Sequence, residues 1–457
     1  MTQAAIQPSR ILPPGPKGRF LVGNALDFSR GDWLEFFVRC AHEHGDVVFF
    51  RFLNVPMCLL THPDDIEDVL VTNSSNFVKS RNYHALKPIL CNGLLISEGA
   101  FWQKQRKLVQ PSFRHESIAA YAEVMADCAQ QMLTDWRDGQ TRDVHQEMMG
   151  LTLEIVAKSL FGTDVSRETG KVGKAMRALT NQLLAMPNIA FFLPEFFPLP
   201  STLRLRRAVR ELNGIIHSII RARRAANSPS HDLLQMLRDA QDEDGSQMTD
   251  EQLRDEMMTL FIAGHETTAI ALSWTWYLLA QNPEVEAKLA DELSNVLKGR
   301  APGVSDLRAL PYTEMVVKET MRLYPPAWVI GRQALRDFEV HGYRLQAGTN
   351  VLLAQWITQR DARFYPEPER FNPDRWKDDP IRSGRFPRYA YFPFGSGRRV
   401  CIGAGFAMME ATLLLATIAQ RFHLTLASDQ SIEMLPLVTL RPKHGIKMML
   451  QERRRRM

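Results

Sequence analysis

A single cysteine, Cys401, stands in a segment that is otherwise poorly suited to a hydrophobic core. Residues 392–405 read FPFGSGRRVCIGAG, so four glycines and two arginines surround it. Glycine allows a ligand to approach the backbone closely, while arginines and the start of the helix expected from residue 402 stabilise a thiolate. A thiolate can be a nucleophile or a metal ligand, and a nucleophile normally needs a general base, yet no histidine lies nearby in sequence. The plainer alternative is a small buried cysteine in a turn.

The full pattern around the cysteine favours metal ligation. Phe394, Gly397, Arg399, Cys401 and Gly403 form F-x-x-G-x-R-x-C-x-G. This pattern resembles the haem-binding signature of the cytochrome P450 superfamily, the haem-thiolate monooxygenases. The resemblance implies that Cys401 is the axial ligand of the iron of haem b (iron protoporphyrin IX), that Phe394 shields the thiolate, and that Arg399 binds a propionate. Gly403 belongs to the same cofactor-binding set, and thiolate ligation favours cleavage of the O–O bond.

A second motif, AGHETT at residues 263–268, lies within the helix expected from about 249 to 281. Glycine and threonine are poor residues for a helix interior, so the motif alone could be a weakly helical turn with threonine hydroxyls on backbone carbonyls. It is similar to the family's oxygen-binding stretch, A-G-x-E-T-T. The resemblance implies that Gly264 makes room for dioxygen and that Glu266 and Thr267 deliver protons to it. We expect His265 to be structural.

Three further residues are candidate partners of the haem propionates. Trp102 and Arg106 match the family's W-x-x-x-R and share one helical face at a spacing of four. The indole N–H and the guanidinium can both donate to a carboxylate. The resemblance implies this role, although such a pair can also be an ordinary surface pair. Arg332 is a third partner that the resemblance implies by position alone.

The residues Glu319 and Arg322 form the family's E-x-x-R pattern, and residues 368–371 read PERF. A spacing of three puts Glu319 and Arg322 on one helical face. We predict that Arg370 completes a Glu319–Arg322–Arg370 network. Since a buried carboxylate needs several hydrogen bonds to offset its desolvation, this network would be structural rather than catalytic.

Composition excludes several classes of protein. Of the 457 residues, 45% are apolar and 23% charged, which is ordinary for a globular protein. Five cysteines without paired spacing argue against a disulfide framework and a zinc site. The N-terminal residues contain no long apolar run, and most of the net charge of +5 comes from the arginines at 453–456. We therefore expect a cytoplasmic monomer without a transmembrane anchor that binds no nucleic acid.

Hydrophobic periodicity predicts a mainly α chain with small β pieces. The resemblance implies the cytochrome P450 fold, one large helical domain with a small β region that spans residues 1–457. A capping box at residues 249–252 is expected to start the long helix, and residues 365–394 are expected to be irregular. The expected strands cover 46–52 and 57–60, with strand-like pieces up to about 352. The expected helices cover about 32–44, 63–73, 98–110, 117–137, 143–161, 171–186, 201–224, 249–281, 283–298, 312–323 and 402–421.

The function implied is a monooxygenase that inserts one oxygen atom from O2 into an apolar substrate of the terpene, fatty acid or steroid class. No Rossmann fingerprint or flavin domain is visible, so electrons are expected from a separate ferredoxin or flavodoxin with its NAD(P)H-dependent reductase. Lys104, Arg106, Lys107 and Arg398 could form a basic docking face, or they could be ordinary surface charge. The apolar residues 327–330 and 191–200 correspond to the distal pocket and the substrate lid of the family, and the second segment could equally be a packed loop.

Two other classes stay open. A peroxide-driven peroxygenase or a haem-thiolate isomerase would need no electron partner, and a haem sensor or carrier would need no turnover. The Glu266–Thr267 pair favours the monooxygenase, because a proton relay would be superfluous in a carrier.

Overall fold

The computed structural model describes residues 12–30, 33–162, 175, 179, 200–226, 232–428 and 430–453. These residues form two compact units, each assembled from segments that are distant in sequence. Unit 1 contains the residues up to Asn82 together with Trp328–Pro368 and Gly384–Val400. Unit 2 contains Tyr83–Ala327, Glu369–Ser383 and the residues from Cys401 onward. The boundary passes between Val400 and Cys401, so the cysteine motif contributes residues to both units.

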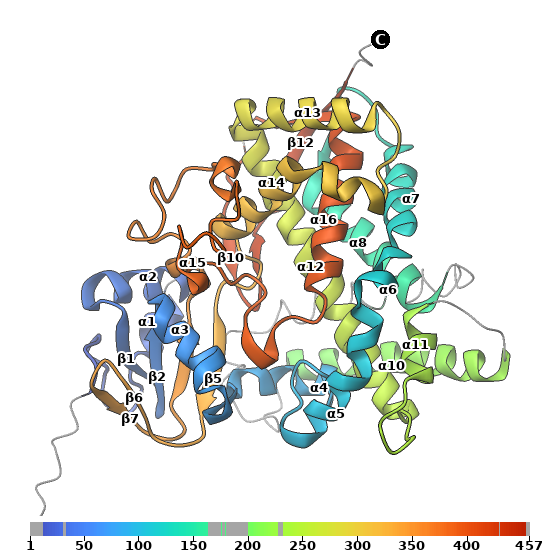
Figure 1. Cartoon of the computed structure of the whole chain (residues 1–457). Helices are drawn as coiled ribbons and strands as arrows, with labels where there is room; N and C mark the ends of the chain where they lie inside the picture. Colours follow the sequence, from blue (N-terminus) through green and yellow to red (C-terminus); the bar gives the residue numbers. More distant parts are fainter. Residues whose placement is uncertain are drawn as a thin grey trace, which may run out of the picture. The chain divides into compact units, whose positions relative to one another are not determined.

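Unit 1 is built on a five-stranded sheet in the order β1-β2-β8-β5-β3 (Figure 1). The pair β2–β8 is parallel and the other pairs are antiparallel. Both of the first two strands bury apolar side chains, among them Val, Phe and Leu, which favour strands, so the strands predicted at 46–52 and 57–60 are confirmed. The strands are β1 Val47–Phe52, β2 Val55–Leu60, β3 Phe77–Lys79, β5 Ile330–Ala334 and β8 Asn350–Leu353, with a separate hairpin of β6 Phe338–Val340 and β7 Tyr343–Leu345. The short helices are α1 Ala25–Arg30, α2 Trp33–His44, α3 Pro63–Glu67, η1 Asp68–Thr72, η2 Ser74–Asn76, α15 Gln355–Thr358, η9 Arg388–Ala390 and η10 Gly397–Arg399, and η3 Arg81–Leu86 leads into unit 2.

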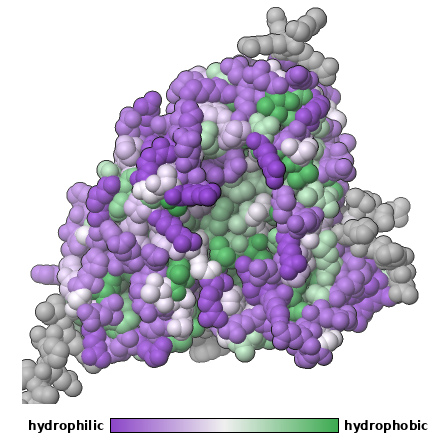
Figure 2. All heavy atoms as spheres, in the orientation of Figure 1, coloured by the Kyte–Doolittle hydropathy of each residue, from purple (hydrophilic) through white to green (hydrophobic). Residues whose placement is uncertain are grey.

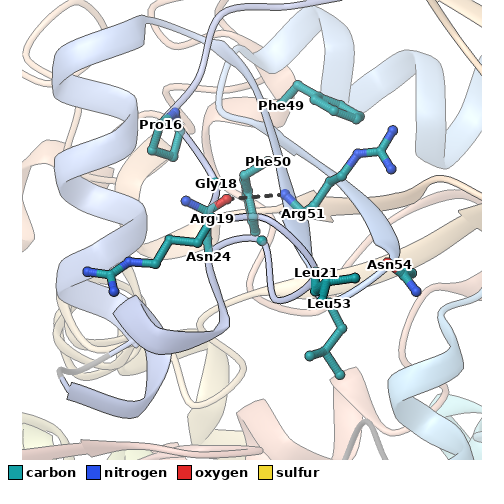
Figure 3. Close-up of a pocket in the computed structure, with 11 residues that line it drawn as sticks. Pro16, Gly18, Arg19, Leu21, Asn24, Phe49, Phe50, Arg51, Leu53 and Asn54 are labelled. Atoms are coloured by element: carbon teal, nitrogen blue, oxygen red, sulfur yellow. Dashed lines mark hydrogen bonds between the residues drawn. The ribbon is translucent and has the colours of Figure 1, made fainter.

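A cleft of about 310 Å³ lies in unit 1 between the N-terminal segment and β1 (Figure 3). Its lining includes Arg19, Asn24 and Arg51, and the backbone N–H of Arg51 donates to Asn24 Oδ1 at 3.3 Å. The lining contains no residue that the sequence analysis assigned to the reaction. We therefore assign this cleft no catalytic role.

Unit 2 is mostly helical (Figure 1). Its helices are α4 Lys87–Leu90, α5 Gly99–Val109, η4 Gln110–Phe113, α6 His115–Ala119, α7 Ala122–Leu133, α8 Val144–Phe161, α10 Pro200–Ala226, α11 Leu233–Asp239, α12 Asp250–Gln281, α13 Pro283–Leu297, η7 Val304–Ala309, α14 Pro311–Leu323, η8 Pro373–Trp376 and α16 Ala404–Ala419. Its strands form one sheet in the order β4-β12-β9, from Thr141–Asp143, Lys447–Glu452 and Phe422–Leu426, and a hairpin of β10 Met434–Pro436 and β11 Leu440–Pro442.

The long helix α12 organises unit 2. Thr249 accepts from the backbone N–H of Gln252, and the Gln252 side chain accepts from the Thr249 N–H, which confirms the predicted capping box. Most of its 32 residues are buried, and α8 packs along it. A helix that is buried on nearly all sides must be central to its unit. Three residues of the AGHETT motif, His265, Glu266 and Thr268, are therefore buried in unit 2.

The mainly α class is confirmed, with local differences in the elements. The helix predicted at 117–137 is two helices, α6 and α7, and the helix predicted at 63–73 continues from α3 into the π-helical turn η1. The apolar segment predicted at 191–200 lies almost wholly outside the described residues, as does the helix predicted at 171–186 apart from the helical Ala175 and Leu179.

Hydrophilic side chains cover most of the molecular face that Figure 2 shows, with smaller apolar areas among them. Among the described residues, no helix combines the length and the apolar character that crossing a bilayer requires.

Candidate active site

The ten predicted site residues divide between the two units. Unit 2 holds Trp102, Arg106, Gly264, Glu266, Thr267, Cys401 and Gly403, and unit 1 holds Arg332, Phe394 and Arg399. Within unit 2 the structure places Arg106 within electrostatic reach of Cys401, and Glu266 and Thr267 are consecutive residues of α12.

Cys401 differs from the other four cysteines of the chain, all of which lie in the described part. It alone is exposed, whereas Cys40, Cys58 and Cys128 are buried. Burial raises the pKa of the Cys40 thiol to about 12 and that of Cys128 to about 11, so these thiols are inert at neutral pH. Cys401 precedes α16, whose first helical residue is Ala404. An exposed thiol before a helix N-terminus is placed to react or to bind a metal.

The surroundings of Cys401 leave space for a ligand. Gly403, the N-cap of α16, has a φ of −87°, which any residue can adopt, and an added Cβ would meet its nearest atom only at 3.8 Å, on Phe113. Ile402, Ala404 and Phe406 are only partly buried, although residues 409–419 of the same helix are all buried. Partly exposed apolar side chains beside a thiol suit a flat apolar group with a metal at its centre.

Arg106 supplies positive charge beside this thiol. It lies on α5 one turn after Trp102, so the predicted common face of the two residues is confirmed. Burial lowers the pKa of the Arg106 guanidinium, and the negative charge of Cys401 acts in the opposite direction. Trp102 is buried. A thiol, a guanidinium and an indole N–H form the donor set that an iron porphyrin with propionate groups requires, so these residues fit a haem.

The three residues in unit 1 occupy different elements. Arg332 lies on β5, is buried, and donates from Nη1 to the carbonyl of Gly331 at 2.9 Å. Phe394 lies in the loop before η10, and Arg399 is the last residue of that helix. Gly397 at the start of η10 has a φ of +64°, and an added Cβ would lie 2.0 Å from the Leu70 carbonyl oxygen. The backbone conformation and this close approach explain the glycine at 397.

The middle of α12 presents an open side at Ala263 and Thr267, although most residues around them are buried. The Thr267 hydroxyl donates to the carbonyl of Ala263 at 2.8 Å. Its single proton is thereby used, and its oxygen is left to accept a hydrogen bond. At Gly264 an added Cβ would lie 2.8 Å from Val156 on α8. Close helix packing is thus one reason for this glycine, and its role in making room for dioxygen stays a prediction.

Glu266 is engaged by residues that the sequence analysis did not identify. Arg441 and Thr439, on and next to β11, both donate to Glu266 Oε1. Burial by itself would raise the pKa of Glu266, but the charge of Arg441 and the two hydrogen bonds outweigh it, so the pKa is lowered. Glu266 is therefore ionised at neutral pH. Residues that are adjacent in a helix do not face each other, so Glu266 and Thr267 point to different sides of α12.

Two histidines complete this polar region. The ring of His145 on α8 lies 3.0 Å from the Ser273 hydroxyl, and burial together with the Arg441 charge lowers its pKa to about 4. His145 is thus neutral at neutral pH. His265 is buried, its Nδ1 lies 3.2 Å from the carbonyl of Phe261, and its own carbonyl accepts from Thr152 at 2.9 Å. These contacts are of the structural kind that we expected for His265.

A further carboxyl group, that of Glu410, lies close to the Thr268 side chain of α12. Glu410 on α16 is fully buried, and burial raises its pKa to about 8. Neither of its oxygens has a hydrogen-bond donor in suitable geometry among the described residues, although the Thr268 hydroxyl is close enough to lower its pKa. That hydroxyl donates instead to the Gly264 carbonyl, at 3.4 Å. Glu410 could have been noticed in sequence, because it is the single charged residue of an apolar helix.

The network around Glu319 differs from the prediction in one member. Arg322 binds both carboxylate oxygens of Glu319 at 2.9 Å, as expected. The second guanidinium is that of Arg375, at 2.8 Å, and not that of Arg370. Arg370 is exposed and accepts through its backbone carbonyl from Arg322 and Arg375. The turn η8 carries Arg375 inward and adds the indole N–H of Trp376 at 2.9 Å, which explains the difference.

The chain is similar to known proteins over nearly its whole length. The model of the family described as Cytochrome P450 matches residues 13–449. Cyclooctatin synthase of Streptomyces melanosporofaciens is 37% identical over 93% of this chain and 92% of that protein. Pentalenene oxygenase of Streptomyces avermitilis is 33% identical over 91% of this chain and 92% of that protein. Cyclooctat-9-en-7-ol 5-monooxygenase of Streptomyces melanosporofaciens is 33% identical over 85% of this chain and 84% of that protein.

Proposed function

The chain belongs to the cytochrome P450 family, and from this premise we propose that it oxygenates an apolar terpene with electrons from a separate redox protein. Membership makes the chain a haem-dependent monooxygenase. The observation that carries the assignment to particular residues is the exposed Cys401 before α16, with Arg106 within electrostatic reach.

We propose haem b as the cofactor, and Cys401 would hold its iron as a thiolate ligand. Arg106 and Trp102 would hold propionates from α5, and Gly403 would leave room beside the thiolate. Phe394, Arg399 and Arg332 belong to unit 1, and their roles as thiolate shield and propionate partners are proposed from the motif alone. When bound, the haem supplies the binding and reductive cleavage of dioxygen.

The proton path is assigned to α12. Thr267 Oγ1, whose proton is directed to the Ala263 carbonyl, would accept a hydrogen bond and hold a water in place. Glu266 is ionised beside Arg441, so it must take up a proton before it can pass one on. Because Glu266 and Thr267 point to different sides of the helix, a water or a rotation of Glu266 must connect them.

The substrate class is chosen from three apolar classes. Terpenes, fatty acids and steroids all fit the apolar segments of the sequence. The name pentalenene oxygenase denotes a protein that acts on a terpene hydrocarbon, which is why we favour a terpene. A spectral binding screen over the three classes tests this choice, and tighter binding of a fatty acid or a steroid would overturn it.

The remaining assignments are also proposals. We propose that the chain acts as one catalytic domain over residues 1–457, supported by the family match over 13–449. We further propose a cytoplasmic monomer that takes electrons from a ferredoxin or flavodoxin served by an NAD(P)H-dependent reductase. Product formation with such surrogate proteins, compared with peroxide alone, distinguishes a monooxygenase from a peroxygenase and from a carrier that forms no product.

The decisive test of the site is Cys401→Ser. We expect the reduced carbon monoxide complex to lose the absorption band that is diagnostic of thiolate ligation, and oxygenated product to disappear. Cys91→Ser is the matched control, because Cys91 is the other cysteine that is not fully buried. Retention of the band and of product by the Cys401 variant would show that another residue holds the iron.

A further inference from the structure

An acidic hairpin covers the side of α5 that carries Lys104 and Lys107, a contact that no pattern in the sequence predicts. Lys104 and Lys107 share one side of α5 at a spacing of three, and 37% and 55% of their side chains are exposed. Lys104 Nζ lies 3.3 Å from Asp242 and 3.7 Å from Asp244. Lys107 Nζ lies 2.5 Å from Glu243. These lysines, which we considered as part of a basic docking face, are therefore paired within the chain.

The hairpin, residues 241–247 between α11 and α12, is held by hydrogen bonds within the loop. Gln241 and Gln247 form an antiparallel bridge, and the Asp242 N–H donates to the Ser246 carbonyl at 2.9 Å. Asp244 Oδ1 accepts from the Ser246 N–H at 2.9 Å, and Gly245 turns the chain at a φ of +76°. The Ser246 hydroxyl accepts from Lys104 at 2.8 Å. Hydrogen bonds within the loop thus hold its carboxylates against α5.

The charge balance at this surface is acidic. Backbone and side-chain hydrogen bonds lower the pKa values of Asp242 and Asp244, so both are ionised at neutral pH. Three carboxylates of the hairpin face two lysines, which leaves one net negative charge. An acidic protein that approached the outer side of α5 would be repelled by the hairpin rather than attracted by the lysines.

Another side of α5 carries Arg106, which belongs to the proposed haem site. Arg106 lies within electrostatic reach of Cys401. A helix is about 10–12 Å wide with its side chains. A protein docked on Lys104 and Lys107 would therefore be separated from the Arg106 side by about one helix width.

We propose that the hairpin 241–247 is an intramolecular competitor for an acidic electron-donor protein, which must displace it to bind Lys104 and Lys107 on α5. The proposal rests on the proposed function, since only an enzyme with an external electron source needs such a donor. Ion pairs between exposed side chains are weak and are screened by salt, so the hairpin can be displaced without unfolding the unit.

The test measures the association rate constant and Kd for the ferric holoenzyme with an acidic [2Fe–2S] ferredoxin as the probe, at low and at high salt. The triple variant Asp242→Asn, Glu243→Gln, Asp244→Asn keeps the shapes of the hairpin side chains and removes their charges. We expect its association rate constant to rise about tenfold at low salt, since electrostatic steering changes such rates by about 10–1,000-fold. The gain should vanish at about 1 M salt, where the screening length is about 3 Å.

A matched control removes three carboxylate charges elsewhere in unit 2. Glu284→Gln, Asp291→Asn and Glu314→Gln lie on α13 and α14 and change the net charge by the same amount. This control should raise the rate constant by less than about twofold, because charges far from the docking surface are screened. An equal gain in both variants would mean that net charge alone acts, and the proposal would be wrong.

A second pair of variants tests where the donor binds. Lys104→Gln with Lys107→Gln should weaken ferredoxin binding, and in that background the hairpin substitutions should have little further effect. This non-additivity is what a shared contact produces. The proposal would be wrong if the lysine substitutions left the association rate constant and Kd for the ferredoxin unchanged. It would also be wrong if the ferredoxin bound neither the wild type nor the triple variant. Failure of the proposed function is distinguishable, because it would appear as a missing thiolate band in the wild-type carbon monoxide complex.

Discussion

Two buried glutamates of unit 2 have the same burial and opposite environments. Glu319 on α14 and Glu410 on α16 both have 0% of their surface exposed. Glu319 accepts hydrogen bonds from Arg322, Arg375, Trp376 and the backbone N–H of Asn372. Glu410 has one hydroxyl group nearby and, among the described residues, no charged partner. Burial alone therefore does not decide whether a carboxyl group is charged, and the donors around it do.

The difference assigns the two residues different tasks. A carboxylate with two guanidiniums fixes the irregular segment around η8 to α14, and all its lone pairs are used. A neutral carboxylic acid such as Glu410 can release its proton, and its carboxylate can take one up again, without breaking an ion pair. Glu266 stands between these cases. Arg441 keeps it ionised, and the hydrogen bonds from Arg441 and Thr439 both go to the same oxygen, Oε1.

The largest effect is expected from breaking the Glu319 network. Glu319→Gln leaves two buried guanidiniums without their carboxylate, which should destabilise the protein by about 3–5 kcal/mol. Urea unfolding followed by circular dichroism measures the loss. Glu314→Gln on the same helix is the control, since its ion pair with Lys318 is partly exposed and should cost less than about 1 kcal/mol. Equal losses in the two variants would refute the structural role of the network.

An intermediate effect is expected from Arg441→Met, which leaves Glu266 buried without its charged partner, an environment closer to that of Glu410. Losing a charged hydrogen bond should cost about 2–3 kcal/mol at pH 7, and burial should then raise the pKa of Glu266 above its usual value. In the wild type, ionised Glu266 contributes stability at neutral pH that is lost as the pH falls through its lowered pKa. In the variant the sign reverses, and stability should fall as the pH rises above about 4.5.

The catalytic readout of this variant is the ratio of product to NAD(P)H consumed. We expect the ratio to fall and its pH profile to shift, because the relay residue changes its protonation state. Arg441→Lys keeps the charge and should restore most of both properties. A purely structural arginine would lower stability in Arg441→Met while leaving the coupling ratio and its pH profile as in the wild type.

Glu410→Gln is expected to change the pH dependence of stability, with little effect near pH 5. Between its usual pKa of 4.5 and its folded value of about 8, Glu410 holds a proton that the unfolded chain releases. Wild-type stability therefore falls as the pH rises through this window, by at most about 1.4 kcal/mol per pH unit. The variant should show a weaker fall in urea unfolding from pH 5 to pH 8.

The fall should not vanish in this variant, because burial also raises the pKa of Glu256 to about 8. Glu256→Gln is therefore the comparison variant, and each substitution should remove part of the slope. A slope identical to that of the wild type in Glu410→Gln would mean that Glu410 is ionised in the folded protein.

Much of the fold could be predicted because its signals are local. The capping box of α12, the proline in the first turn of α13 and the apolar pattern of β1 and β2 each act within a few residues. The split between α6 and α7 was missed, because the hydrophobic pattern continues across it. The boundary between the two units at Val400 and Cys401 had no signal in the sequence, since it divides a single motif.

The sequence by itself determined the family, the mainly α class and the motif residues, because these follow from residue type and short spacing. The tertiary structure alone decided which charges meet. Arg441 lies 175 residues from Glu266, Arg375 lies 56 residues from Glu319, and Ser246 lies 142 residues from Lys104. Helix periodicity and capping act over a few residues, whereas ion pairing depends on the path of the whole chain, and one sequence holds no signal for contacts at such separations.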